Sequence, residues 1–223
     1  MSCEVLARAT KRFSHVVFDW NGTLLDDFPL AVRSVNYVLE KYDRRPIDAA
    51  RYHQDFGFPI RNFYERLGFD FSAIPFEDVM RDYLSVFDAA LSDCPLHDGT
   101  LELLDQLDAL QIPASILTAS HQETLNAALR HFGLEHRFVH RIGLPDANAH
   151  SKLELAHDLQ RTLELDREKI LYIGDTTHDG DVARAMGWAC VAIPRGHQPR
   201  STLAANGLGL VEGLHEIQEL IRT

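Results

Sequence analysis

Acidic and small residues follow an apolar stretch near the start of the chain, and their spacing could support chemistry on an anion. Residues 16–18 are apolar, and the run ends at Asp19, followed by Asn21, Gly22 and Thr23. A parallel strand presents the residues at its carboxyl end to the ligand crevice of an α/β sheet. Gly22 would let the backbone approach a ligand closely. The same pattern also fits a strand followed by an ordinary Asx turn, so its meaning depends on residues further along the chain.

Four polar positions further along the chain could meet Asp19 at one edge of a sheet. Thr118 and Asp175 each end an apolar segment, Lys152 begins an expected helix, and Asp179 lies at the turn after Asp175. Asp19 and Asp175 would repel each other unless a cation lay between them, and Mg²⁺ prefers a few carboxylates together with water and phosphate oxygens. A lysine at a helix N-terminus is unfavourable to the helix dipole, which suggests that Lys152 faces an anion.

The elements that must position these residues follow an α/β pattern that is interrupted once. Residues 28–92 show helical periodicity without a convincing strand, whereas strands and helices alternate from residue 93 onward. We therefore predict an α/β fold, a Rossmann-like doubly wound parallel sheet built from residues 1–27 and 93–223, with an inserted all-helical cap at 28–92. The helices expected in the cap are 29–42, 48–55, 60–67 and 76–91, and the later strands are 114–118, 138–140, 169–175, 189–193 and 208–211.

The composition restricts the class of protein. The 223 residues, 45% of them hydrophobic, can form a full core. A formal net charge of -11 argues against nucleic acid and anionic membranes as partners, but a metal and a few local cations could still attract a small anionic substrate. Cys3, Cys94 and Cys190 fit neither a disulfide framework nor a zinc cluster, so we expect a cytoplasmic protein. The oligomeric state is left open.

The ordered motifs resemble those of the haloacid dehalogenase-like superfamily. The similarity extends over about residues 16–193, and its overall pattern is similar to the phosphoglycolate phosphatase-like subgroup. The resemblance implies a Rossmann-like core with a helical cap that selects a small phosphorylated metabolite. The matching segments are Asp19-Trp20-Asn21-Gly22-Thr23, Ile116-Leu117-Thr118, Ser151-Lys152 and Gly174-Asp175-Thr176-Thr177-His178-Asp179.

The resemblance also implies a role for each motif residue in the hydrolysis of a phosphate ester. Asp19 would attack the phosphoryl group and form an aspartyl-phosphate. Thr118 and Lys152 would hold the transferring oxygens, because positioning and charge neutralisation dominate phosphoryl transfer. The expected Mg²⁺ ligands are Asp19, the backbone carbonyl of Asn21, Asp175 and Asp179. The residues expected to contact the substrate are Trp20 and Gly22 through their backbone, Thr118, Ala119, Lys152, Arg61 and His121.

Two of these expected contacts have weaker support. Arg61 follows the cap loop Gly57-Phe58-Pro59, where a cation could pair with a substrate carboxylate or a second phosphate, although a surface arginine fits equally well. His121 comes directly after the strand end at Thr118 and could face the pocket.

Asn21 departs from the phosphatase pattern, which has an aspartate two residues after the nucleophile. That second acid protonates the leaving oxygen and later deprotonates the attacking water, a contribution of ~10²–10⁴-fold in rate. An amide cannot exchange a proton near neutral pH. The expected hydrolysis would therefore be weakened unless another group replaces the acid.

Several interpretations of Asn21 remain open. The leaving group could need little protonation, as a phosphate or an acyl group does, or His53 or His121 could supply the base. The protein could be a slow phosphatase, could transfer a long-lived phosphoryl group to another acceptor, or could bind phosphate for regulation. A metal-free dehalogenase would leave Asp175 and Asp179 without a role. A phosphonoacetaldehyde-type hydrolase would need a lysine over the site, where the cap offers only Lys41.

Overall fold

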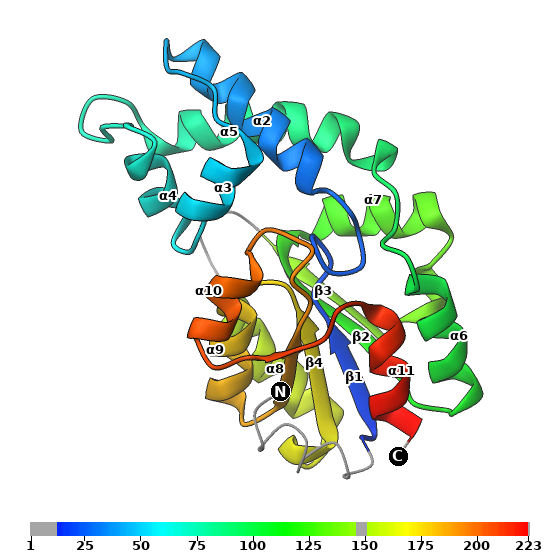
Figure 1. Cartoon of the computed structure of the whole chain (residues 1–223). Coiled ribbons are helices and arrows are strands. Elements are labelled where there is room, and N and C mark those ends of the chain that lie inside the picture. The colour runs from blue at the N-terminus through cyan, green and yellow to red at the C-terminus, as the bar shows by residue number, and fades with distance from the viewer. Residues whose placement is uncertain (1–12, 146–150, 223) are drawn as a thin grey trace.

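A six-stranded parallel sheet forms the centre of the protein in this computed structural model, which describes residues 13–145 and 151–222 (Figure 1). The strand order is β3-β2-β1-β4-β5-β6, so β1, the strand that leads into Asp19, lies in the middle of the sheet. The predicted α/β fold with a parallel sheet is confirmed. The strands are β1 (His15–Phe18), β2 (Ala114–His121), β3 (His140–Leu144), β4 (Ile170–Gly174), β5 (Ala189–Ala192) and β6 (Gly209–Leu210).

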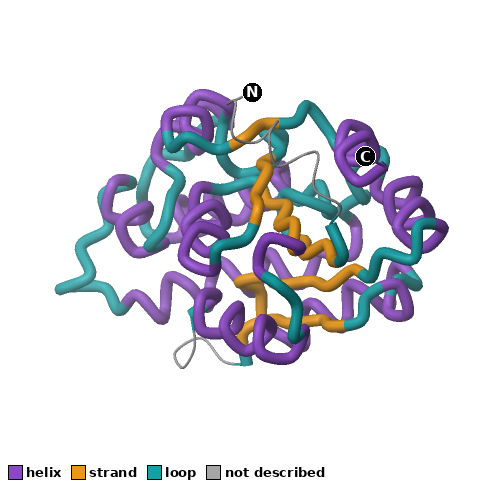
Figure 2. The backbone as a smooth tube through the Cα atoms, turned by 90° about the horizontal axis from the view of Figure 1, so that it is seen from below, coloured by secondary structure: helices purple, strands orange, loops and turns teal. Residues whose placement is uncertain are grey.

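Helices cover both faces of the sheet, and the alternation of side chains along each strand decides which layer a residue joins. Val17 and Tyr172 pack in one apolar cluster with α8 and α9. Phe18 and Ile173, one position further along, pack in the other cluster with α6, α7 and α11. Figure 2 shows helices on either side of the strands. These helices are α6 (Thr100–Ala109), α7 (Gln122–Phe132), α8 (Lys152–Leu163), α9 (Thr177–Met186) and α11 (Leu214–Arg222).

A helical insert, residues 28–92, lies beyond the carboxyl ends of the central strands (Figure 1). Its four α-helices begin and end within one residue of the predicted bounds, because Pro and Gly punctuate the sequence between them. A short 3₁₀ turn at Leu91–Asp93 follows the last of them. That the insert is a separate domain remains a prediction. The helices are α2 (Phe28–Lys41), α3 (Ala49–Asp55), α4 (Ile60–Arg66) and α5 (Phe76–Ala90).

The two segments that connect the insert to the sheet are hydrogen-bonded to each other. The Asp26 N–H donates to the Pro95 carbonyl over 2.9 Å, and the His97 N–H donates to the Leu24 carbonyl over 2.8 Å. An antiparallel bridge lies between these two bonds. The chain therefore leaves the sheet and returns to it as one short two-stranded ribbon.

Three element predictions needed correction. A strand was expected at residues 138–140, but Phe138 instead packs edge-to-face on Phe18, and β3 begins only at His140. β2 continues past Thr118 to His121. The helix α10 (Arg200–Ala205) was not predicted, because one and a half turns are too short for a periodic pattern to show. Within the described ranges, every helix is too short or too polar to cross a bilayer.

Candidate active site

Four charged side chains meet at the carboxyl edge of the sheet. Asp19 follows β1, Asp175 follows β4, Lys152 is the first residue of α8 and Asp179 lies in the first turn of α9. Lys152 Nζ is 2.9 Å from Asp19 Oδ1 and 2.6 Å from Asp179 Oδ1. All four residues are buried. The structure thus brings Asp19 together with three of the four positions that the sequence analysis expected to meet it, namely Lys152, Asp175 and Asp179.

The start of α8 directs Lys152 into this site. Ser151 caps the helix, and its side chain and that of Glu154 form a reciprocal capping box. Burial by itself would lower the pKa of Lys152, but Asp179 and Asp19 outweigh it and raise the pKa to about 12. The lysine therefore keeps a full positive charge despite its position at the positive end of the helix dipole.

Asp179 is fixed by neighbours on its own side of the sheet. Its Oδ2 accepts hydrogen bonds from the backbone N–H (3.0 Å) and the hydroxyl (2.7 Å) of Thr176. Its Oδ1 accepts from the Tyr172 hydroxyl over 3.0 Å as well as from Lys152. Burial acts to raise the pKa of Asp179, but Lys152 and the bonds from Thr176 outweigh it and lower the pKa. The ionised form of Asp179 is therefore favoured by its neighbours.

Asp175 is enclosed by two tight loops. Its Oδ1 accepts from the Thr23 hydroxyl over 3.2 Å, and its Oδ2 accepts from the backbone N–H of His197 over 2.6 Å. A Cβ atom at Gly22 or at Gly196 would overlap this carboxylate, and Gly22 also has a φ of 70°. Glycine is therefore required at residue 22 both by backbone conformation and by close approach.

The three acids are suited to hold a divalent cation. One carboxylate oxygen from each of Asp19, Asp175 and Asp179 lies within 4.8 Å of the others. Burial, opposed by the charge of Lys152, raises the pKa of Asp19 to about 6. Burial also raises the pKa of Asp175 to about 8. Three carboxylates face one ammonium group, so a hard cation with a preference for oxygen ligands, such as Mg²⁺, would relieve the remaining repulsion.

Both ends of the Asn21 amide are already bonded. Its Oδ1 accepts from the Ser120 hydroxyl, and its Nδ2 donates to Asp27 Oδ2 over 3.0 Å. The second oxygen of Asp27 accepts the Gly22 N–H over 2.6 Å. An ionised carboxylate can only accept, so the amide nitrogen must face Asp27. Asn21 therefore serves as a hydrogen-bond bridge in the turn after Asp19.

Asp27 lies directly before the first insert helix, where an acid commonly caps the helix with its side chain. Asp27 is the N-cap residue of α2, yet its side chain makes no capping bond and turns toward the site. His197 Nε2 lies 3.3 Å from Asp27 Oδ2. Burial would lower the pKa of His197, but Asp27 outweighs it and raises the pKa to about 9. The sequence analysis missed this pair, although an acid so close to Asn21 was a usable signal.

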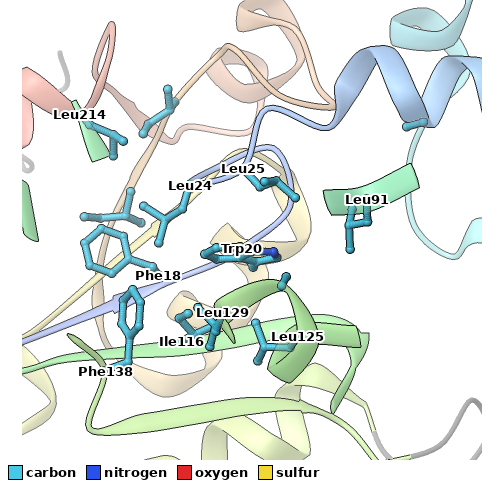
Figure 3. Close-up of a cluster of buried hydrophobic side chains, with 14 of the residues drawn as sticks. Phe18, Trp20, Leu24, Leu25, Leu91, Ile116, Leu125, Leu129, Phe138 and Leu214 are labelled. Atoms are coloured by element: carbon cyan, nitrogen blue, oxygen red, sulfur yellow. The ribbon is translucent and has the colours of Figure 1, made fainter. Parts of the chain in front are cut away.

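The expected phosphate cradle lies between β1 and β2. Thr118 is buried, and its hydroxyl accepts the Ser120 N–H over 3.2 Å, while Ala119 is half-buried. The Trp20 indole points away from the acids into the core, 6.2 Å from the Phe132 ring between centroids. Figure 3 shows Trp20 among the labelled core side chains. Only the backbone of Trp20 is therefore available to a ligand, as the sequence analysis assumed.

The contacts of Arg61 lie within the insert. Its guanidinium stacks over the rings of Phe71 (4.7 Å) and Phe76 (5.5 Å), and it pairs with Glu65 over 3.6 Å. In the described residues these contacts do not connect Arg61 to the acids, so its role toward a substrate stays a prediction. His121 is half-buried at the end of β2.

His53 lies where the insert meets the core. Its ring stacks on Phe28 with centroids 4.4 Å apart, and its Nε2 is 3.2 Å from the Gly196 carbonyl oxygen. Phe58 stacks on His178 with centroids 4.6 Å apart. The cap loop Gly57-Phe58-Pro59 therefore contacts the first turn of α9.

Comparison with known proteins agrees with this architecture. A phosphoglycolate phosphatase of Synechococcus elongatus is 28% identical over 195 residues, which cover 85% of this chain and 88% of that protein. Tyrosine-protein kinase PtkA of Mycobacterium tuberculosis is 29% identical over 187 residues, which cover 82% of this chain and 62% of that protein. A crystal structure described as a predicted phosphatase from Clostridium acetobutylicum superimposes with a TM-score of 0.83 at 23% identity, covering 95% of this chain and 99% of that one.

A family model decides the assignment. The model described as haloacid dehalogenase-like hydrolase matches residues 16–193. That range covers most of the chain and includes the three acids and the lysine of the site as well as the whole insert. The chain therefore belongs to the haloacid dehalogenase-like hydrolase family.

Proposed function

We propose that this protein is a Mg²⁺-dependent phosphatase that hydrolyses a small phosphorylated metabolite through an aspartyl-phosphate at Asp19. The observation that carries the proposal is the buried pair of Asp19 and Lys152, 2.9 Å apart, beside two further carboxylates. The similarity to a phosphoglycolate phosphatase supports a phosphate ester as the substrate class. In this proposal the helical insert selects the substrate.

In the first step, a carboxylate oxygen of Asp19 forms a bond to phosphorus while the bond between phosphorus and the leaving oxygen breaks. Lys152 offers its charge to the phosphoryl oxygens, and Thr118 offers a hydroxyl. Asp19, Asp175, Asp179 and the backbone carbonyl of Asn21 would hold Mg²⁺, which supplies further positive charge at the phosphoryl oxygens. The electron pair of the broken bond remains on the leaving oxygen.

In the second step, water attacks phosphorus, the bond to Asp19 breaks and inorganic phosphate leaves with the water oxygen. Each step needs a proton transfer that Asn21 cannot provide, because its amide neither gains nor loses a proton and is bonded to Ser120 and Asp27. For the first step we therefore propose a substrate whose leaving oxygen is stable without a proton, such as an acyl phosphate or a phosphoanhydride. In the second step the electron pair of the broken bond returns to the Asp19 carboxylate, and one proton of the attacking water passes to a phosphoryl oxygen, so that phosphate leaves with both water protons.

The test is phosphate release from a panel of small phosphorylated compounds, including acyl phosphates and pyrophosphate, with Mg²⁺ or with EDTA. We expect release only with Mg²⁺, and a loss of at least about 10³-fold in Asp19→Asn. The matched control is Asp181→Asn, because Asp181 is an exposed acid of α9 that pairs with Arg184. Release that survives in Asp19→Asn would contradict the proposal.

Phosphoryl transfer to another acceptor is the second candidate function. The bonded amide of Asn21 favours it, because slow hydrolysis would prolong the aspartyl-phosphate, and so does the similarity to a tyrosine-protein kinase. Intact-protein mass after incubation with acetyl phosphate and Mg²⁺ distinguishes the two. A phosphoryl adduct that persists in wild type and is absent in Asp19→Asn would support transfer, whereas rapid loss of the adduct as free phosphate would support hydrolysis.

A further inference from the structure

His197 connects three parts of the protein that are far apart in the sequence. Its backbone N–H donates to Asp175 Oδ2 over 2.6 Å. Its Nε2 lies 3.3 Å from Asp27 Oδ2, and its Nδ1 lies 3.0 Å from the hydroxyl of Tyr52 in the insert helix α3. Because the Asp27 carboxylate can only accept, Nε2 carries a hydrogen, and Nδ1 is left for Tyr52. All four residues are buried.

Asp27 extends the connection to the turn after Asp19. Its two oxygens accept from the Gly22 N–H and from the Asn21 side chain. The Tyr52–His197–Asp27 hydrogen-bond chain thus runs from the insert to the turn that carries the nucleophile. Through its backbone, the same histidine also fixes one oxygen of Asp175.

The site is covered in this arrangement. Asp19 is only 7% exposed and Lys152 only 3%. The contacts of Tyr52 with His197 and of Phe58 with His178 join the insert to the loops around the acids. A displacement of the insert that opens the site to a phosphoryl group would separate Tyr52 from His197.

We propose that His197 is a positioning residue that couples the position of the insert to Asp175, so that the acid takes its metal-binding position only when Tyr52 is bonded to the imidazole. The proposal rests on the metal-binding role given to Asp175 in the proposed function. It assigns to Tyr52 and His197 a part in the reaction although neither contacts the reacting atoms.

The first variant is Tyr52→Phe, which removes the hydroxyl and keeps the ring that packs on Phe28, Phe56 and Phe63. The matched control is Tyr64→Phe, because Tyr64 is an equally buried insert tyrosine whose hydroxyl has no hydrogen-bond partner among the described residues. Titration calorimetry with Mg²⁺ alone is the readout. We expect the Kd for Mg²⁺ to rise about three- to tenfold in Tyr52→Phe and to stay within about twofold in Tyr64→Phe.

The second variant is His197→Phe, which keeps the backbone N–H and the ring packing and loses both side-chain bonds. The Tyr52 hydroxyl acts through His197, so adding Tyr52→Phe to His197→Phe should change the Mg²⁺ Kd no further. Thermal unfolding is measured on the same proteins. Independent, additive effects on the Kd, or a Tyr52→Phe variant that loses thermal stability while its Kd stays at the wild-type value, would overturn the proposal.

The outcomes separate this inference from the proposed function. Wild-type protein that binds Mg²⁺ and shows the expected coupling, but releases phosphate from no compound, would reject the phosphatase and support the role of His197. Mg²⁺-dependent phosphate release with equal Mg²⁺ affinity in Tyr52→Phe and Tyr64→Phe would support the phosphatase and reject the role of His197. Wild-type protein that binds no Mg²⁺ would reject both.

Discussion

Asp27 and Asp179 are fully buried carboxylates on opposite sides of the same site, and both have a lowered pKa. Asp179 obtains its partners from Thr176, Tyr172 and Lys152, all in the core around β4, α8 and α9. Asp27 obtains its partners from the turn after Asp19 and from His197, which in turn contacts the insert. The bonds of Asp179 therefore lie within the core, whereas those of Asp27 depend on how the insert and the core meet.

This difference shows that burial alone does not define the role of a charged group. Asp179 stabilises the lysine, and its hydrogen-bond partners all lie in the core rather than in the insert. Asp27 stabilises the contact between the turn after Asp19 and His197, which in turn is bonded to Tyr52 of the insert. If Tyr52 moves away, the bond between His197 and the insert is lost. Replacing one acid at a time and measuring hydrogen exchange in the insert tests this difference.

Asp179→Asn should have the largest effect on stability. It removes one of the two buried carboxylate partners of Lys152, and breaking a buried ion pair from one side typically costs about 3–5 kcal/mol. Urea unfolding of the metal-free protein measures the loss. Hydrogen exchange of residues 49–58 in the insert should not increase beyond what the lower global stability explains. Asp181→Asn, at an exposed pair, should change the free energy of unfolding by less than about 0.5 kcal/mol.

Asp27→Asn should lower the free energy of unfolding less than Asp179→Asn does, but it should also loosen the insert. The loss of charge-assisted bonds from the Gly22 N–H and His197 predicts a decrease of about 2–3 kcal/mol in the free energy of unfolding. Hydrogen exchange of residues 49–58 should accelerate more than the global loss accounts for. Equal responses of the insert in Asp27→Asn and Asp179→Asn would remove the distinction between the two acids.

Asn21→Asp tests whether Asp27 makes the amide necessary. The new carboxylate would lie beside Asp27 Oδ2, which now accepts from the amide over 3.0 Å, and repulsion should lower the free energy of unfolding by about 2 kcal/mol. The double change Asn21→Asp with Asp27→Asn restores one acid and one amide and should recover more than half of that loss. Phosphate release is measured on the same variants. A large gain in its rate would show that Asn21 limits turnover.

A further prediction concerns pH and separates the acids with a lowered pKa from the acids that hold protons. The pKa of Asp175 is raised to about 8 and that of Asp19 to about 6, so in the metal-free protein protons occupy these groups as the pH falls through those values. Mg²⁺ binds the ionised forms, and its affinity should therefore rise about 100-fold between about pH 6 and about pH 8.5. Asp27 and Asp179 stay ionised over this range and contribute no slope. Titration calorimetry that shows a constant affinity would contradict the prediction.

The acids and the lysine could be placed from the sequence because local structure fixes them. Asp19 and Asp175 follow apolar strands, Lys152 and Asp179 lie in the first turns of helices, and parallel strands bring those positions to one edge. The helices of the insert were predictable for a similar reason, since Pro and Gly mark their ends.

The histidine partner of Asp27 could not be placed in this way. His197 lies in a loop without periodicity, and its contacts with Asp27 and Tyr52 depend on the packing of three distant segments. The position of β3 was missed because His140 and Arg141 are polar edge-strand residues with no apolar pattern. Sequence patterns therefore predicted the residues whose positions follow from local strand and helix structure. They missed the contacts that form only when the insert packs against the core.

The ribbon that joins the insert to the sheet has a mechanical consequence. Its two strands are bonded to each other at Asp26–Pro95 and at Leu24–His97, so they cannot move independently. A hydrogen-bonded ribbon bends across its plane more readily than its strands slide past each other, because sliding would break the bonds between them. We expect the insert to swing along one arc, which would return Tyr52 and Phe58 to the same partners after every opening without any further guide.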